Sequence, residues 1–412
     1  MQPTWSAVVQ HRFGFLVIQR ANALSSHHTP NAEFQPLYSP VSAQADAFRT
    51  VEYNAQSMRA WLRKSWPVLK TVLALAILVA IGRQFARDLA RPELWQRTLH
   101  PGWLGLSAVL YLLGLGFSAF YWYRLLVLLG QRPALLATVR AHYIGQMGKY
   151  LPGKAWALFL RSNLVRSSTT RVGVAILTSF YEVFITMLSG AVFAAVWFGV
   201  QAEEFASLAD GHIARGIWTV FHGDAADGIS VPPQDLCLLA LVLVAGIGIP
   251  SLPPVFHRLV QRLTLPFRQA DAADLPTPQT NCAIQGLILT PGCWLMLGAS
   301  LWATLHAVGA GPAWSWENWM RVTAFVALAY VSGFIILFLP SGLGAREALL
   351  LVVLIPDLRQ RLGLGPDEAR SLAALTVIVL RLVWTAAEVA MVAVLYWLPT
   401  PAPAGSENGS GR

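Results

Sequence analysis

The chain has 412 residues, of which 55% are hydrophobic and only 12% are charged. Soluble domains carry about 25% charged residues, so this composition argues against an ordinary soluble protein. The net charge of +9 comes from basic residues beside apolar segments, which argues against nucleic acid as a partner and favours anionic lipid. Three cysteines, Cys237, Cys282 and Cys293, match no spacing of a metal site, so no metal is expected.

Residues 1–57 differ from the rest because they are polar and show no helical period. Met58 opens the basic stretch MRAWLRKSWP directly before the first apolar run, so we expect the natural start near this residue. We interpret 1–57 as a disordered extension or a mis-called start, 58–399 as a membrane domain and 400–412 as a disordered tail.

Seven apolar runs follow, each long enough for a bilayer whose hydrocarbon core of roughly 30 Å requires about 20 helical residues. The backbone N–H and C=O groups of an open strand find no hydrogen-bond partner in lipid, whereas those of a helix bond to one another. The sequence therefore predicts an all-α, polytopic membrane protein with about seven spanning helices, and tryptophans at the ends of the runs suit the headgroup zone. The runs cover residues 67–86, 103–123, 172–199, 236–256, 284–309, 321–340 and 371–398.

Loop charges indicate the orientation. The stretch 124–171 carries eight basic residues and no acid, whereas 200–235 carries six acids against Arg215 alone. By the positive-inside rule the first stretch is cytoplasmic and the second is external, which places the N-terminus in the cytoplasm. We expect the bacterial cytoplasmic (inner) membrane, although the basic loop 84–102 fits this orientation poorly.

The first of two shorter, interrupted stretches, about 134–165, contains HYIGQMGKYLPGKAW, in which proline and glycine break the helical ladder. We predict a turn at 151–154 and then a new helix to about Arg166. The interrupting residues are Gly145, Gly148, Pro152 and Gly153. The start of this helix presents free N–H groups and a positive dipole end that suit a phosphate. Further positive charge comes from Lys149, Lys154 and Arg161.

The second interrupted stretch, about 341–356, belongs to GFIILFLPSGLGAREALLL. It is interrupted by Pro340, Ser341, Gly342 and Gly344. A short helix is expected from about Ala345, with Ser341 as its cap. Arg346 and Glu347 lie at the start of this helix.

Non-helical backbone is tolerated at membrane depth only where protein buries it or water reaches it. Two interrupted segments in corresponding parts of a transporter-like chain therefore point to a substrate site, in which the segments are broken or re-entrant helices. The alternative is a pair of ordinary turns at the membrane surface, in which case Lys149 and Lys154 only set the topology.

Ionisable residues also lie deep inside two of the apolar runs: Glu182 in the third, and Arg381 and Glu388 in the last. A charge at the bilayer centre costs about 2.5–3.5 kcal/mol on insertion scales, so such residues usually pair or line a path. Glu182 has two candidate partners, Arg381 or a basic residue of the first interrupted stretch, and the sequence leaves both open. A structural ion pair and a functional role are equal alternatives.

The string GQMGKYLPGKAW resembles the first hallmark of the flippase-like transmembrane family, also called the lysylphosphatidylglycerol synthase transmembrane region family. FLPSGLGAREA resembles its second hallmark, a Pro-Gly-Gly-Leu-Gly-x-Arg-Glu pattern in which Ser341 here replaces the first glycine. Glu182 and Arg381 fall where relatives tend to carry an acid and an arginine. The resemblance covers roughly residues 65–398.

The resemblance implies movement or handling of a membrane lipid, such as aminoacylated phosphatidylglycerol, a glycolipid, a hopanoid or a polyprenyl-linked sugar. In the bifunctional synthases of this family a soluble aminoacyl-transfer domain follows the membrane region. That domain does not follow here, so we do not expect the synthase reaction.

The leading hypothesis is a translocase for an anionic lipid, with Glu182 and Glu388 balancing charge. The expected headgroup ligands are Lys149, Lys154, Arg161 and Arg346. No cofactor is expected, because the chain contains no G-x-x-x-x-G-K-[ST] motif. Two alternatives stay open: a membrane transferase with Glu182 as general base, and a scaffold whose partners are lipid-synthesis enzymes. The oligomeric state is left open as well.

Overall fold

The computed structural model describes residue 83 and residues 98–150, 155–205, 233–264, 275–335 and 345–397. The chain divides into two compact units, Met1–Lys70 and Thr71–Arg412, and the described residues all belong to the second. Within these ranges every regular element is a helix, which confirms the predicted all-α class. The extension 1–57, nearly all of the run 67–86 and the tail 400–412 lie outside the described residues.

Five of the described helices are long and apolar enough to cross a membrane, which indicates an integral membrane protein. They are α3 (Pro101–Leu128), α6 (Val172–Phe205), α8 (Pro233–Ser251), α10 (Thr280–Ala307) and α13 (Pro366–Trp397). The run 321–340 corresponds to α11, Trp316–Ile335, which is not one of these five. The total of seven spans therefore stays a prediction.

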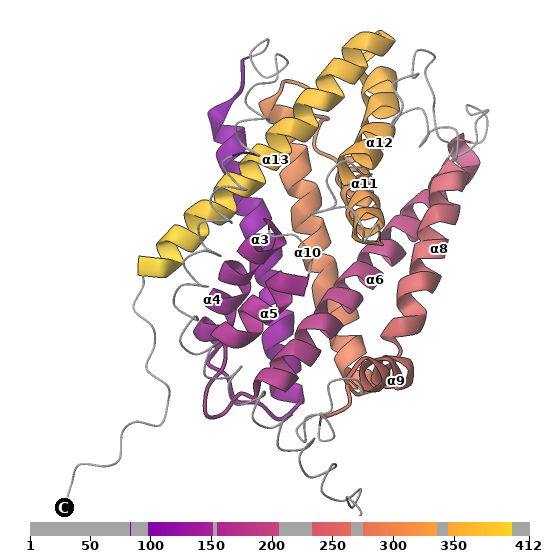
Figure 1. The fold of residues 1–412 in the computed structure, drawn as a ribbon. Coiled ribbons are helices and arrows are strands. Elements are labelled where there is room, and N and C mark those ends of the chain that lie inside the picture. The colour runs from indigo at the N-terminus through magenta and orange to yellow at the C-terminus, as the bar shows by residue number, and fades with distance from the viewer. Residues whose placement is uncertain are drawn as a thin grey trace, which may run out of the picture. The chain divides into compact units, whose positions relative to one another are not determined.

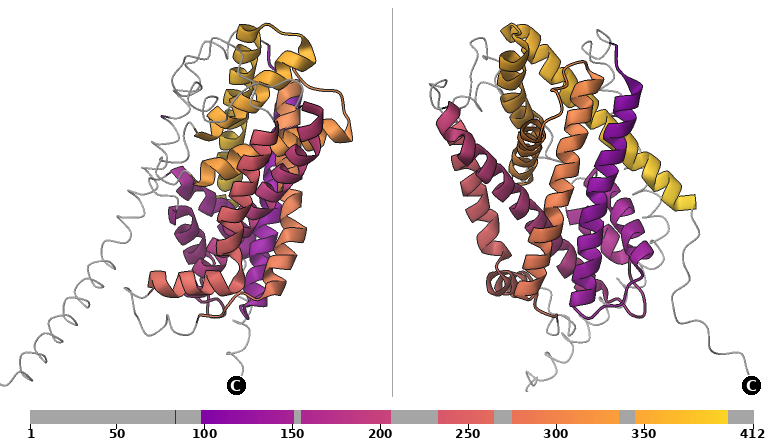
Figure 2. Two further views of the ribbon diagram at one scale, coloured as in Figure 1. Left: turned by 90° about the vertical axis from the view of Figure 1, so that its right-hand side faces the viewer. Right: turned by 180° about the vertical axis from the view of Figure 1, so that it is seen from behind.

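The long helices pack along one another. Figure 1 shows α3 and α10 side by side, α6 and α8 paired, and α13 crossing α3 obliquely, and the rear view in Figure 2 agrees. The helix α11 contacts α6 and α10 and also α12, Ala345–Leu362. Buried leucine, valine and alanine side chains of α10, α11, α12 and α13 form the core between them.

Glycine allows α10 to approach its neighbours closely. A Cβ added at Gly114 of α3 would lie 2.5 Å from Cδ1 of Leu297, and one added at Gly298 would overlap the hydroxyl of Thr323 in α11. Helices in lipid associate largely through van der Waals contact, so small residues at these points bring the backbones together.

A buried polar network holds α13 against α3 and α10. The Ser107 hydroxyl lies 2.8 Å from that of Ser300, and the indole Nε1 of Trp384 donates to the Ser300 hydroxyl at 2.8 Å. Lipid offers no partner for such groups, so the network fixes the register of α13. Glu388 lies one helical turn after Trp384 and is thereby placed against Tyr111 of α3.

The predicted limit of the fourth run, 236–256, is wrong. The spanning helix α8 ends at Ser251, and two prolines open a new helix, α9, Pro253–Thr264. The left view in Figure 2 shows α9 lying crosswise to the long helices. Phe256 is buried, with its ring centroid 4.9 Å from that of Tyr181. The last apolar residues of the run therefore belong to the buried face of an amphipathic helix.

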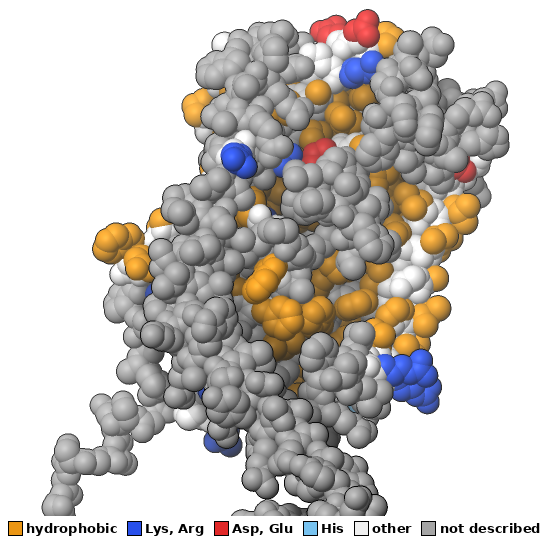
Figure 3. Space-filling model, viewed as in Figure 1, with side chains coloured by type: hydrophobic (Ala, Val, Ile, Leu, Met, Phe, Trp, Pro, Cys, Tyr) orange, Lys and Arg blue, Asp and Glu red, His pale blue; other side chains and the backbone are white. Residues whose placement is uncertain are grey.

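The two ends of the bundle carry different side chains. Aromatic rings gather where α3 begins and α10 ends, with Trp302 at 5.3 Å from Trp103 and 5.4 Å from Trp314. Basic side chains lie at the other end beside α9, as Figure 3 shows, with hydrophobic side chains on the flank between. Tryptophan side chains prefer the headgroup zone of a membrane, so their position at the ends of the predicted runs fits a membrane protein.

Replacing Gly298 by alanine should destabilise the protein, because the new Cβ would overlap the Thr323 hydroxyl and lie 2.6 Å from the Thr323 Cα. We expect a loss of about 1–3 kcal/mol, the usual cost of overpacking. Thermal unfolding of the purified variant in detergent measures this loss. Gly246→Ala is the control, because nothing lies within 4 Å of a Cβ there. Equal midpoints for the two variants would contradict the close packing of α10 on α11.

Candidate functional site

The first interrupted stretch forms three short elements. They are α4, Leu135–Gln146, the 3-10 turn η2, Met147–Tyr150, and α5, Ala155–Leu164. Two helices with a break between them agree with the prediction. The predicted turn at 151–154 lies outside the described residues, and so do Pro152, Gly153 and Lys154.

Gly145 and Gly148 allow α5 to fold back onto α4 and η2. A Cβ at Gly145 would lie 2.6 Å from the Cβ of Arg161, and a Cβ at Gly148 would lie 2.5 Å from the Cα of Ala157. Any side chain larger than hydrogen would force these helices apart. The two glycines thus do more than interrupt a helix, because they shape the compact hairpin that carries Lys149.

Most of the second interrupted stretch belongs to α12, which begins at Ala345 as predicted, and the preceding helix α11 is described as far as Ile335. A Cβ at Gly333 would lie 3.0 Å from the Cβ of Arg346, so this glycine permits a close approach of α12 to α11. Arg346 and Glu347 lie in the first turn of α12. The predicted interrupting residues Pro340, Ser341, Gly342 and Gly344 lie outside the described residues.

Glu388 of α13 accepts three donors from other elements. Its Oε1 accepts from the Lys149 ammonium and from the Tyr111 hydroxyl, and its Oε2 accepts from the Tyr150 hydroxyl at 3.0 Å. The Glu388 side chain is 1% exposed, whereas the Lys149 side chain is 34% exposed. A buried carboxylate is therefore neutralised by a lysine that keeps one side open.

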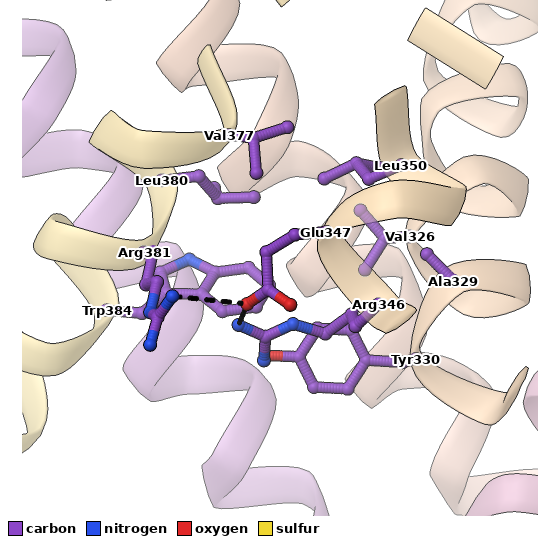
Figure 4. Close-up of a pocket in the computed structure, with 10 residues that line it drawn as sticks. All are labelled: Val326, Ala329, Tyr330, Arg346, Glu347, Leu350, Val377, Leu380, Arg381 and Trp384. Atoms are coloured by element: carbon purple, nitrogen blue, oxygen red, sulfur yellow. Dashed lines mark hydrogen bonds and ion pairs between the residues drawn. The ribbon is translucent and has the colours of Figure 1, made fainter. Parts of the chain in front are cut away.

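Glu347 holds the arginines of the site. Its Oε1 accepts from Nη2 of Arg346 at 2.9 Å and lies 3.8 Å from Nη1 of Arg381. Arg346 also donates to the Tyr330 hydroxyl at 2.6 Å, and its guanidinium lies 4.5 Å from the centroid of that ring. Figure 4 shows these side chains converging from α11, α12 and α13.

Trp384 lies between the side chains around Glu388 and those around Glu347. Its ring stacks on Tyr111 with centroids 4.5 Å apart, and it lies 5.3 Å from the Tyr330 ring. Lys149 is also within electrostatic range of both arginines, Arg346 and Arg381. We call five residues the α13 charge cluster: Lys149, Arg346, Glu347, Arg381 and Glu388. It contains three cations and two carboxylates.

A small cavity opens between α11, α12 and α13 beside this cluster. Figure 4 shows the polar side chains on one side of it, and the apolar side chains of Val326, Leu350 and Val377 on the others. Its volume is about 10 Å³, which is enough for about one water molecule. A larger ligand would require these helices to separate.

Arg161 belongs to a different group, in which it is 3% exposed. Its Nη2 donates to Oε2 of Glu182 at 2.7 Å and to the Ser179 carbonyl at 2.7 Å, and its Nη1 lies 2.9 Å from Nδ1 of His142. The ring of Trp122 covers the guanidinium at 4.8 Å. Glu182 therefore pairs with the first interrupted stretch rather than with Arg381, and this answers the question that the sequence leaves open.

The structure thus separates the predicted site residues into two groups. It brings together the α13 charge cluster, whereas Arg161 and Glu182 fasten α5 to α6. Sequence reasoning missed the aromatic residues Tyr111, Tyr150, Tyr330 and Trp384. Trp384 and Tyr150 had a usable signal, because one lies one turn from Arg381 and Glu388 and the other adjoins Lys149. Tyr111 and Tyr330 had none.

No family model matches the chain, and no curated protein sequence matches it either. The candidate site therefore rests on the sequence and the geometry of this chain.

Arg161→Ala should destabilise the protein strongly, because it leaves Glu182 buried without its cation. The expected loss is about 3–5 kcal/mol, whereas the double variant Arg161→Met with Glu182→Met should recover most of it. Thermal unfolding in detergent provides the measurement. The exposed Arg166 is the matched control, and Arg166→Ala should change stability by no more than about 0.5 kcal/mol. A midpoint for Arg161→Ala equal to that of the control would rule out a structural role.

Proposed function

We propose that the chain is a lipid translocase of the bacterial cytoplasmic membrane, and that the α13 charge cluster holds the anionic headgroup of its lipid. The substrate class is an anionic phospholipid, a glycolipid or a polyprenyl-linked lipid. Lys154, which lies outside the described residues, is a further proposed headgroup ligand.

The meeting of cations from both hallmark-like strings on α13 carries this proposal. The Lys149 ammonium contacts Glu388, and Glu347 lies 2.9 Å from Arg346 and 3.8 Å from Arg381. Each charge placed at the centre of a bilayer costs about 2.5–3.5 kcal/mol on insertion scales, so charged residues there usually pair or line a substrate path. A group of three cations with two carboxylates suits an anionic headgroup.

The location of the cluster also favours a transport role. Lys149 and Tyr150 come from the first interrupted segment, and Arg346 and Glu347 come from the start of the helix after the second. Interrupted helices are the elements that many transporters use at their substrate sites, since the positive ends of the half-helices point at anionic groups of the substrate. The small cavity fits a closed state that must open to admit a headgroup.

Access from the bilayer would keep the acyl chains in lipid. Moving a chain into water costs about 0.8 kcal/mol per CH₂, so a route that carries only the headgroup through protein is much cheaper. Lys149 is one third exposed and is the side of the cluster at which a headgroup would first meet a cation.

The resemblance to the flippase-like transmembrane family supports the same function. Lys149 lies in the string that resembles the first hallmark, and Arg346 and Glu347 lie in the string that resembles the second. The residues of the two strings meet at α13. This is the arrangement expected if both strings serve a single lipid site.

A transferase that uses Glu182 as its base is less well supported. One oxygen of Glu182 accepts from Arg161 at 2.7 Å, and the other accepts from the Thr186 hydroxyl at 3.2 Å. Both oxygens are thus engaged within the bundle. A general base needs an oxygen directed at the proton that it removes.

Removing a cation from the cluster should stop translocation. In proteoliposomes that contain fluorescently labelled phosphatidylglycerol, Lys149→Gln and Arg346→Gln should each slow the movement of the label by at least about tenfold, which is a barrier increase of about 1.4 kcal/mol. Dithionite quenching of the outer leaflet measures the rate.

The control for this experiment is Arg359→Gln, because Arg359 is an exposed arginine on the same helix, α12. It should translocate like the wild type. Wild-type rates in both cluster variants would contradict the proposal. A chemically altered lipid, detected by mass spectrometry, would indicate the transferase instead.

A further inference from the structure

The surroundings of Glu388 resemble a binding site for an oxyanion more than they resemble an ordinary ion pair. One ammonium and two phenolic hydroxyls, from Lys149, Tyr111 and Tyr150, all donate to this carboxylate. Such donors serve a phosphate oxygen as well as a carboxylate oxygen, because both accept charge-assisted hydrogen bonds. The donors come from α3 and η2, and only the acceptor comes from α13.

We propose that Glu388 occupies an anion subsite of the chain, and that the phosphate of the ligand takes the donors Lys149, Tyr111 and Tyr150 by displacing this carboxylate. The inference rests on the proposed function and goes beyond it in two ways. It identifies Tyr111 and Tyr150 as ligand-binding residues, and it makes Glu388 an internal competitor of the ligand.

Charge balance supports the exchange. A phosphodiester carries one negative charge, as the Glu388 carboxylate does, so the subsite keeps its charge when one replaces the other. With the ligand bound, the α13 charge cluster and the phosphodiester together carry three positive and three negative formal charges.

The partial exposure of Lys149 also supports this exchange of anions. Glu388 is buried, but the ammonium that it contacts belongs to a side chain that is one third exposed. An incoming anion can therefore reach Lys149 before Glu388 leaves. The exchange can proceed without an unpaired cation at any stage, which avoids the cost of an isolated buried charge.

The test is the affinity of the full-length protein in detergent for dihexanoyl phosphatidylglycerol and, separately, for inorganic phosphate. Glu388→Gln removes the competing charge and keeps the shape of the side chain. Its affinity for the lipid should rise by about tenfold or more, the effect of losing one charged competitor. In a Lys149→Gln background the same substitution should have a smaller effect, because the cation for which both anions compete is gone.

Two conservative variants test the hydroxyl donors of the subsite. Their result holds even if Glu388→Gln fails to fold. Tyr111→Phe and Tyr150→Phe should each weaken lipid binding by about threefold or more, because each removes one hydrogen bond to the phosphate. The matched control is Tyr123→Phe on α3, whose ring lies beside Phe120 at 6.3 Å. It should bind like the wild type. A merely structural role for the two tyrosines predicts lower stability with unchanged affinity.

The outcomes separate the two proposals. If the wild type binds the lipid but Glu388→Gln binds it equally or more weakly, or both tyrosine variants bind like the wild type, the anion subsite is wrong and the proposed function stands. If the wild type binds neither probe, both proposals fall. Tight binding of inorganic phosphate with no binding of the lipid, strengthened by Glu388→Gln, supports the subsite and overturns the lipid as its ligand.

Discussion

The site depends on the neutralisation of one buried carboxylate. Glu388 of α13 faces α3 and η2, where an unpaired charge would be very costly, so its three donors stay on it while no ligand is bound. That constraint ties the first interrupted segment to α13. The network of Ser107, Ser300 and Trp384 in turn ties α13 to α3 and α10. The position of the site follows from the register of one helix.

Two groups of buried charged side chains among the described residues differ in whether a ligand could reach them. Arg161 and Glu182 satisfy each other and their neighbours within α4, α5 and α6, so this group fastens helices together. The α13 charge cluster contains three cations and two carboxylates, includes residues from both interrupted stretches and is partly exposed at Lys149. Glu182 and Glu388 both lie inside apolar runs, but only the partners distinguish a structural pair from a candidate binding site.

Much of the fold could be predicted from local pattern. Apolar length located α3, α6, α10 and α13, and the start of α12 at Ala345 was also predicted. The pairings could not be predicted, because Tyr111 and Glu388 are 277 residues apart and no periodicity links them. The end of α8 was also missed, since Phe256 is as apolar as a membrane-facing residue but belongs to an amphipathic helix. Hydrophobicity identifies buried positions and does not identify what they are buried against.

Cross-linking in native membranes tests the central claim most directly, namely that the first interrupted segment meets α13 at a charged site. Cysteines at 149 and 388, in a protein whose three native cysteines are replaced by serine, should be joined efficiently by a short bifunctional thiol reagent. Cysteines at 149 and 359 should stay unlinked. Absence of the 149–388 link, with both cysteines shown to be reactive, would contradict the account.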